Sequence, residues 1–387
     1  MSPRTPVVPP VLDVDTVLDT AKILVCTGSG GVGKTTTAAS LALRAAERGR
    51  RTVVLTIDPA RRLAQSMGLT ELDNTPRRVE GVDVSRGGSL DAMMLDMKRT
   101  FDEIVLTHAE PSKADAILGN PFYQALSSSF AGTQEYMAME KLGQLQATGD
   151  YDLVVVDTPP TRSALDFLDA PERLTTFLDG RMIRILLAPA KAGGRAYFKV
   201  ISGSISLFTS VITKIIGAQV LQDVSQFIAA LETMFGGFRE RAQGTYDLLK
   251  APGTAFVVVA APERDALREA AYFVERLAEE SMPLAGLVVN RVHRSGGSGL
   301  SAERSTAAAQ SLDEAGGHEL AAAVLRLHAD RVALSARERR LQERFSGAHP
   351  QVPVVEVAAQ PGDVHDLDGL RSVGEDLAGG AAAAVPA

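Results

Sequence analysis

Cysteine is almost absent from this 387-residue chain, which contains a single one. That residue, Cys26, lies in an apolar run, where a lone thiol packs as a small core side chain. Because one cysteine has no second thiol to pair with, disulfides within the chain are excluded. Metal sites built on several cysteines, including the common structural zinc sites, are excluded as well.

An excess of positive charge is also lacking. The chain has 40 lysines and arginines against 47 aspartates and glutamates, which gives a net charge of −7. A general nucleic-acid-binding protein would carry a basic surface, so we expect no nucleic-acid partner. Hydrophobic residues make up 45% of the chain, which is enough for a substantial core and favours a globular protein.

The apolar core of a signal peptide is missing from residues 1–10, which are rich in proline. We therefore expect a cytoplasmic protein, with peripheral attachment to a membrane as a further option. The length allows two domains or one large α/β domain with an insertion. We expect the second arrangement, with an N-terminal arm at 1–20 that includes a short helix, a nucleotide domain at 21–375, and a low-complexity Ala/Gly tail at 376–387.

Residues 28–35 match the pattern G-x-x-x-x-G-K-[ST], the phosphate-binding loop of many nucleotide-binding proteins. The apolar run at 23–27 predicts a strand before the loop, and the Ala- and Leu-rich run at 36–48 predicts a helix after it. In such a unit, backbone N–H groups and the helix N-terminus bind phosphate. The sequence therefore predicts a site for a nucleoside triphosphate, formed by Gly28, Ser29, Gly30, Gly31, Val32, Gly33, Lys34, Thr35 and Thr36.

Catalytic and metal-binding side chains are predicted in this loop and at the ends of two buried strands. Lys34 is predicted to be catalytic by binding phosphate oxygens, and the Thr35 hydroxyl is predicted to ligate Mg²⁺. The strand predicted at 52–57 ends at Asp58, and a later one ends at Asp157, where parallel sheets bind ligands. Asp58 is predicted to orient or activate the attacking water or to hold Mg²⁺ through water, and a helix N-cap role is compatible with this. Asp157 is predicted to accept a hydrogen bond from Mg²⁺-bound water.

The segment from about 180 to 250 departs from the alternation of strands and helices. Its apolar residues recur at intervals of three and four, which predicts long amphipathic helices. Residues 200–221 are long enough to cross a membrane, but their Ser and Thr residues, Lys214 and the periodicity favour a soluble helix. The pattern leaves open whether the apolar face packs on its own domain or receives an apolar client.

Strand and helix patterns alternate through the rest of the chain. This alternation predicts an α/β fold with a mostly parallel, doubly wound sheet of the P-loop NTPase type and an α-helical insertion. Asn290 follows a predicted strand, and its amide can both donate and accept hydrogen bonds, so we predict that Asn290 and the adjacent Arg291 bind the base. Among the other predicted elements are helices at 91–106, 123–146 and 263–280, strands at 254–261, 284–289 and 352–357, and a turn region at 111–121.

Together these motifs resemble those of the ArsA-type ATPases, which include the arsenite-pump ATPase and the ATPases that target tail-anchored proteins. The specific marks are G-G-V-G-K-T-T at 30–36, the first switch D-P-A at 58–60 and the long second switch D-T-P-P-T-R-S-A-L-D-F-L-D-A-P at 157–171. The resemblance covers about 22–375 and implies binding and hydrolysis of Mg-ATP. It also implies roles for single residues in binding phosphate and metal, polarising water and contacting adenine, namely Lys34, Thr35, Thr36, Asp58, Asp157, Asn290 and the segment at Pro361.

The resemblance implies an assembly as well. Family members work as face-to-face dimers that ATP closes and hydrolysis opens, so we expect a homodimer or a heterodimer with a related ATPase. The helical insertion lies where the targeting members bind their clients. An apolar client protein or a membrane partner is therefore expected.

Two features depart from the family pattern. The family's early loop lysine, which reaches the nucleotide of the partner subunit, falls at Ser29, and a hydroxyl cannot supply that charge. Either an arginine such as Arg61, Arg62 or Arg162 substitutes, or a different partner chain donates the charge, or hydrolysis is slow. The chain also lacks a C-x-x-C motif and a thiolate cluster, so neither zinc at the dimer interface nor an arsenite-specific role is expected.

Three functions compete on these grounds. The favoured one is an ATPase whose cycle drives client handover or a membrane transport partner. The alternative is an ATP-gated interaction module with little turnover that acts as half of a heterodimer. A partition ATPase on nucleoid or membrane is the least supported, because the acidic balance and the Ala/Gly tail offer no binding surface for either.

Overall fold

The computed structural model of the chain describes residues 9–57, 62–120, 123–124, 133–159, 240–241, 243–294 and 299–382. These residues divide into two compact units. The first unit holds the described residues of 1–94, 148–164 and 249–387, and the second holds those of 95–147 and 165–248.

An eight-stranded sheet forms the centre of the first unit, with the strand order β3-β4-β2-β5-β1-β6-β7-β8. Neighbouring strands are parallel except for β3 and β4, which are antiparallel. Every position of the central strands β1 and β5 is buried, as expected for parallel strands covered on both faces. The predicted mostly parallel sheet is thereby confirmed. The strands are β1 (Ile23–Gly28), β2 (Arg51–Thr56), β3 (Arg77–Arg78), β4 (Ser89–Met94), β5 (Leu153–Asp157), β6 (Thr254–Ala260), β7 (Leu284–Val292) and β8 (Val354–Ala358).

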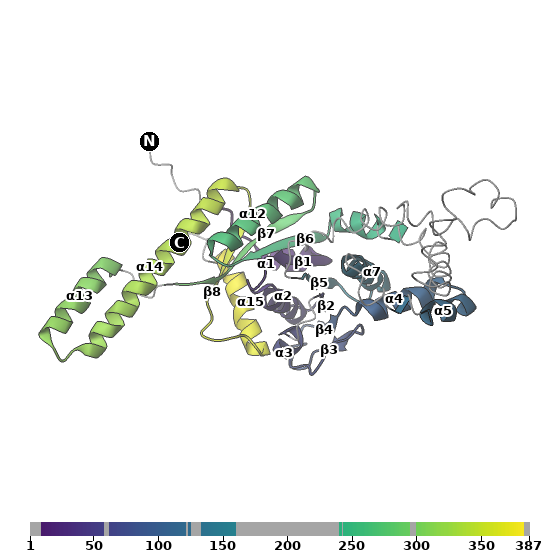
Figure 1. Ribbon diagram of the computed structural model, residues 1–387, viewed down its shortest axis with the longest axis horizontal. Coiled ribbons are helices and arrows are strands. Elements are labelled where there is room, and N and C mark those ends of the chain that lie inside the picture. Colours follow the sequence, from purple (N-terminus) through teal and green to yellow (C-terminus); the bar gives the residue numbers. More distant parts are fainter. Residues whose placement is uncertain are drawn as a thin grey trace, which may run out of the picture. The chain divides into compact units, whose positions relative to one another are not determined.

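Helices flank this sheet on both sides. In Figure 1, α2 and α15 lie on one side of the sheet and α12 lies on the other. The helix α2 can lie close to the strands because its buried residues are mostly alanines and leucines. The helices of this unit are α1 (Val14–Thr20), α2 (Lys34–Glu47), α3 (Arg62–Ser66), α12 (Arg264–Glu279), α13 (Ala302–Ala315), α14 (Glu319–Ala348) and α15 (Leu367–Ala382).

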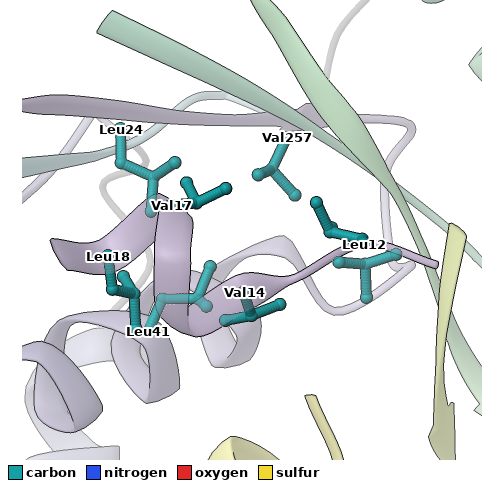
Figure 2. Close-up of a pocket in the computed structure, with 8 residues that line it drawn as sticks. Leu12, Val14, Val17, Leu18, Leu24, Leu41 and Val257 are labelled. Atoms are coloured by element: carbon teal, nitrogen blue, oxygen red, sulfur yellow. The ribbon is translucent and has the colours of Figure 1, made fainter. Parts of the chain in front are cut away.

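The N-terminal segment packs on the sheet from about residue 10 onward, which corrects the expectation of a loose arm at 1–20. The Leu12 N–H donates to the carbonyl of Val354 on the edge strand β8, and the Val354 N–H donates to Pro10. Val14 and Leu18 of α1 are buried. Figure 2 shows their side chains in an apolar cluster with residues of α2 and the sheet. Burial of this apolar face holds the segment in place.

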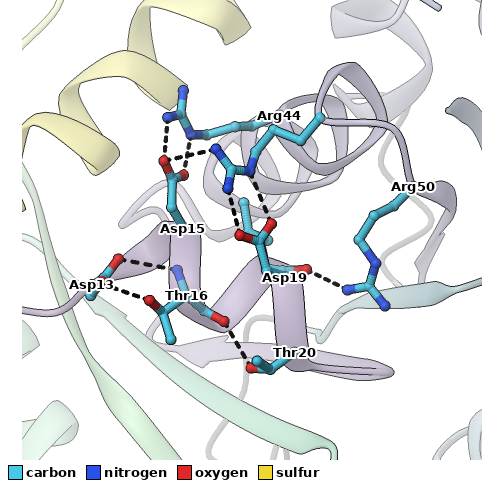
Figure 3. A network of polar contacts seen from close by, with 9 residues as sticks. Asp13, Asp15, Thr16, Asp19, Thr20, Arg44 and Arg50 are labelled. Carbon is cyan, nitrogen blue, oxygen red and sulfur yellow. Dashed lines mark hydrogen bonds and ion pairs between the residues drawn. The ribbon is translucent and has the colours of Figure 1, made fainter. Parts of the chain in front are cut away.

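Ion pairs also tie α1 to α2 (Figure 3). The Arg44 guanidinium donates two hydrogen bonds to the Asp15 carboxylate, at 2.6 and 2.8 Å. Arg48 pairs with Asp15 at 3.0 Å and with Asp19 at 2.6 Å. The bonds from Arg44 lower the pKa of the Asp15 carboxyl below its ordinary value. The start of the chain is therefore attached to the helix that follows the phosphate-binding loop.

The second unit is helical where it is described. Its helices are α4 (Met97–His108), α5 (Pro111–Leu118) and α7 (Thr133–Thr148), and its residues 243–248 are helical too. Lys141 of α7 pairs with Glu103 of α4 at 3.1 Å. The predicted helical insertion at about 180–250 falls outside the described residues except for this last part, so its arrangement stays a prediction.

Three local expectations were wrong. The helix predicted at 91–106 begins only at Met97, because residues 91–94 form the buried end of β4 beside β2, and a short apolar run has no clear period. Most of the expected turn region, residues 111–118, forms the helix α5, which starts with proline, a residue tolerated in the first turn. Residues 376–382, expected in the tail, continue α15 because alanine favours helix and Leu377 is buried.

Candidate functional site

The loop 28–36 runs from the last residue of β1 into the first turn of α2, at the carboxyl end of the central strand. Gly33 is the N-cap residue of α2 and has a φ of 95°, in the left-handed region that favours glycine. Gly28 has no room for a side chain, because a Cβ there would lie 2.1 Å from the carbonyl oxygen of Val259. The chain therefore needs glycine at both ends of this turn, and the amino end of α2 is left open for an anion.

Lys34 is the first residue of α2, and its side chain turns back across the loop. The residue is 6% exposed, and its Nζ donates to the carbonyl of Ser29 at 2.8 Å. The ammonium group is thus held at the loop that is predicted to bind phosphate. A strongly hydrated point charge in a buried position is suited to phosphate oxygens.

Asp157, at the end of β5, joins the loop to the neighbouring strand β2. Its Oδ2 accepts a hydrogen bond from the Thr35 hydroxyl at 2.8 Å and another from the Thr56 hydroxyl at 2.9 Å. Asp157 has no exposed surface. A hydroxyl and a carboxylate side by side are oxygen ligands of the kind that Mg²⁺ uses directly or through water. These residues therefore fit the predicted magnesium site.

Cys26 lies next to this cluster as a free, buried thiol, as the sequence predicted. Burial, and next the negative charge of Asp157, raise its pKa far above the ordinary value of a thiol. The thiol is therefore protonated and unreactive. Thr158 follows Asp157, and its hydroxyl donates to the Cys26 carbonyl at 2.9 Å, which fixes the start of the predicted second switch at 157–171.

Asn290 lies inside β7 rather than after it, because that strand continues to Val292. Its Nδ2 donates to the carbonyl of Val32 at 2.9 Å, and its Oδ1 accepts from the N–H of Arg291 at 2.9 Å. Arg291 has a φ of 63°, within an irregularity of the pairing with β8 between Val289 and Val292. Asn290 thus holds the phosphate-binding loop itself, a contact that the sequence did not predict. Its predicted contact with the base stays a prediction, as does that of Arg291.

A second pair of residues holds the backbone that follows Asn290. Glu338 of α14 is 5% exposed. Its carboxylate accepts one hydrogen bond from the backbone N–H of His293 at 2.9 Å, and it lies 2.7 Å from Nδ1 of the His293 ring. No sequence pattern relates two residues 45 positions apart. Glu338 and His293 were therefore missed as positioning residues.

The other predicted site residues are less informative. Asp58, Arg61 and Arg162 lie outside the described residues, whereas Arg62 is exposed at the start of α3 and Pro361 is exposed between β8 and α15. Within the described ranges no group of three or more His, Cys, Asp or Glu residues could hold a metal. None of the helices described here is long and apolar enough to span a membrane.

Comparison with known proteins adds to this geometry. Residues 21–298 match the family described as anion-transporting ATPase. ATPase GET3 of Malassezia globosa is 33% identical over 168 residues, 43% of this chain and slightly less than half, 47%, of that protein. ATPase ASNA1 homolog 1 of Paramecium tetraurelia is 26% identical over 273 residues, 70% of this chain and 75% of its own length. A putative arsenical pump-driving ATPase 1 of Aquifex aeolicus is 26% identical over 254 residues, 64% of this chain and 57% of that protein.

Proposed function

The chain belongs to the anion-transporting ATPase family and is an ATP hydrolase, and we propose that it uses Mg-ATP in a dimer to drive client handover or a membrane transport partner. The observation that carries the nucleotide part of this proposal is the cluster of Thr35, Thr56 and Asp157 beside Lys34. It places a hydroxyl, a carboxylate and an ammonium group around one glycine loop. This is the donor set that a triphosphate and its divalent cation require.

Each predicted site residue has its own role in this proposal. Lys34 leaves the Ser29 carbonyl and binds phosphate oxygens, while the loop N–H groups and the α2 N-terminus bind the rest. Thr35 and Asp157 would hold Mg²⁺, directly or through water, and a bound Mg²⁺ would neutralise negative charge on the phosphates. Asp58 orients the attacking water and accepts its proton.

The base lies at the carboxyl end of β7 in this proposal. Asn290 and Arg291 are placed there by the strand, and Pro361 follows the adjacent strand β8. Asn290 already uses its amide on the loop and on its neighbour. Its carbonyl oxygen has a second lone pair and its amide a second hydrogen, which are available to adenine.

Ser29 supports a second candidate, an ATP-gated interaction module with little turnover that forms half of a heterodimer. A serine cannot place positive charge on a nucleotide across an interface. In this case the partner chain donates the missing charge. Arsenite binds to clusters of thiolates, and this chain has only the buried Cys26. We therefore do not propose an arsenite-specific role, although the name of the Aquifex protein refers to an arsenical pump.

Calorimetric titration with ATP tests the site. Lys34→Ala is expected to abolish tight binding, because it removes the only cationic side chain of the loop 28–36. Lys98→Ala, which removes an exposed lysine paired with Asp102 in the second unit, is the matched control and should bind like the wild type. Unchanged affinity in Lys34→Ala would contradict the assignment of the loop.

A further inference from the structure

The long helix α14 carries a stripe of large apolar side chains that no other described part of the chain covers. Leu320 is 80% exposed, Val324 56%, Leu327 68% and Leu334 37%. The opposite side of α14 packs along α13, where the small side chains of Ala309, Ala322 and Ala329 are buried. Apolar surface gathered on one helix face marks an interaction site.

The spacing of the stripe indicates what kind of partner it fits. Val324 follows Leu320 by four residues, and Leu327 follows Val324 by three. Leu334 lies seven residues after Leu327, and Arg331 occupies the position between these two at which the pattern would continue. Intervals of four and three repeat every seven residues, which is the pattern of a helix that pairs with another helix along a narrow seam. The one polar residue in such a seam fixes the register of the pair at some cost in stability. The partner that fits is therefore a second apolar helix face.

The distribution of charge selects a second copy of the same helix in the opposite direction. Residues 313–319, at the start of the stripe, contain three acidic residues and no lysine or arginine. One of the three, Asp313, is paired with Arg326 of α14, which leaves Glu314 and Glu319 to supply the negative charge of this end. Residues 331–344, at its other end, contain five arginines against two glutamates. One of those glutamates, Glu338, is already bound to His293. Two copies in antiparallel orientation place each acidic end against a basic end, whereas a parallel pair places like charges together.

We propose that the exposed stripe of α14 pairs with the same stripe of a second copy of this chain, antiparallel and around a two-fold axis. Such an interface is self-complementary, since every contact occurs twice. It joins apolar surface in the centre and opposite charges at both ends. It differs from the nucleotide-closed dimer of the proposed function, and it forms without ATP.

Sedimentation equilibrium in the absence of nucleotide tests the pairing. The wild type is expected to be dimeric, and Leu327→Glu is expected to raise the dissociation constant at least tenfold, because it puts a charge into the centre of the seam. Gln310→Glu, on an exposed position of α13, introduces the same charge on the same hairpin outside the seam and should leave the dimer intact. A monomeric wild type, or equal effects of the two variants, would overturn the proposal.

The same measurements on Lys34→Ala separate this interface from the proposed function. Pairing through α14 should persist when nucleotide binding is lost, so a dimer in Lys34→Ala supports the proposal even if ATP turnover fails. A dimer that disappears in Lys34→Ala would overturn it, because association would then depend on the nucleotide site.

Orientation is measured with spin labels on single introduced cysteines. The native Cys26 is fully buried and protonated, so Leu327→Cys and Leu320→Cys can be labelled one at a time. At a rise of 1.5 Å per residue, an antiparallel pair separates the labels at 320 by on the order of 10–20 Å more than those at 327. Equal distances at the two positions would indicate a parallel pair and contradict the proposed orientation.

Discussion

Two hydroxyl groups from different elements meet at one carboxylate oxygen of Asp157. Thr35 belongs to the loop and Thr56 to β2, and both donate to the same Oδ2. A motif search finds the threonine of the loop and the aspartate at the strand end separately. It does not show that they touch, because 122 residues separate them. The contact follows from the parallel pairing of β1 and β5. This pairing places Asp157, the last residue of β5, beside Cys26 and therefore close to the loop that follows β1.

Removal of the Thr35 hydroxyl should weaken the response to magnesium more than nucleotide binding itself. In Thr35→Ala, Lys34 and the loop N–H groups remain, so ATP affinity without Mg²⁺ is expected to stay within about twofold of the wild type. The increase in affinity on adding Mg²⁺ should fall by roughly tenfold, or about 1.4 kcal/mol. Titration calorimetry with and without Mg²⁺ measures both values. Thr35→Ser keeps the hydroxyl and should restore the increase, and failure of this rescue would count against a metal role.

Asn290 should affect the loop even where no base is bound. Asn290→Ala removes a hydrogen bond to Val32, and one such bond contributes about 1 kcal/mol. Inorganic triphosphate, which has no base, should therefore bind roughly fivefold more weakly to the variant. If triphosphate binding is unchanged while ATP binding falls, the amide acts on the base alone and the positioning role is wrong.

Among the helices and strands, the sequence predicted best those whose periodic segment was long and whose two ends were indicated by the residues there. The helix expected at 263–280 is α12, Arg264–Glu279, whose apolar face is buried on the sheet. The prediction failed at 91–94, where a buried strand carries no alternation, and at Asn290, where β7 runs further than expected. In both places the outcome depends on pairing with a distant strand, which no local window contains.

The attachment of α1 to α2 should make stability depend on pH. The pKa of Asp15 is lowered in the folded chain by Arg44, so its contribution is present above its unfolded pKa of about 3.9 and is lost as pH falls through the lower folded pKa. We expect the thermal midpoint of the wild type to fall more steeply below about pH 4 than that of Asp15→Asn. At pH 7, Asp15→Asn should melt a few degrees lower than the wild type. Parallel curves for the two proteins, followed by circular dichroism, would show that the pair contributes nothing.

The two contacts between Glu338 and His293 should make ATP binding at the proposed nucleotide site sensitive to changes in α14. Glu338→Ala removes one contact to the backbone N–H of His293 and one to its imidazole ring, three residues beyond Asn290. We expect the Michaelis constant for ATP to rise several-fold while kcat changes little, because the proposed base side of the site is loosened and the proposed reacting end is not touched. Steady-state kinetics separate the two parameters, with Glu343→Ala, an exposed residue of the same helix, as the control. A fall in kcat alone would place Glu338 in a different role.

For the whole molecule, the family resemblance drawn from three short motifs is confirmed by a match over residues 21–298. The motifs predict a nucleotide site because its chemistry requires particular residues at particular spacings. The client, the transport partner and the arrangement of the insertion have no such local requirement. They depend on surfaces formed by helices whose apolar faces a sequence period can detect but whose partners it cannot name.

Steady-state ATP turnover of the purified chain tests the central claim most directly. We expect Mg²⁺-dependent turnover by this chain alone that is lost in both Lys34→Ala and Asp58→Asn, with ATP binding retained in Asp58→Asn. This result would mean that the charge missing at Ser29 is supplied within the protein's own assembly. Tight ATP binding by the wild type without turnover would contradict an autonomous ATPase and would favour a half-site that another chain completes.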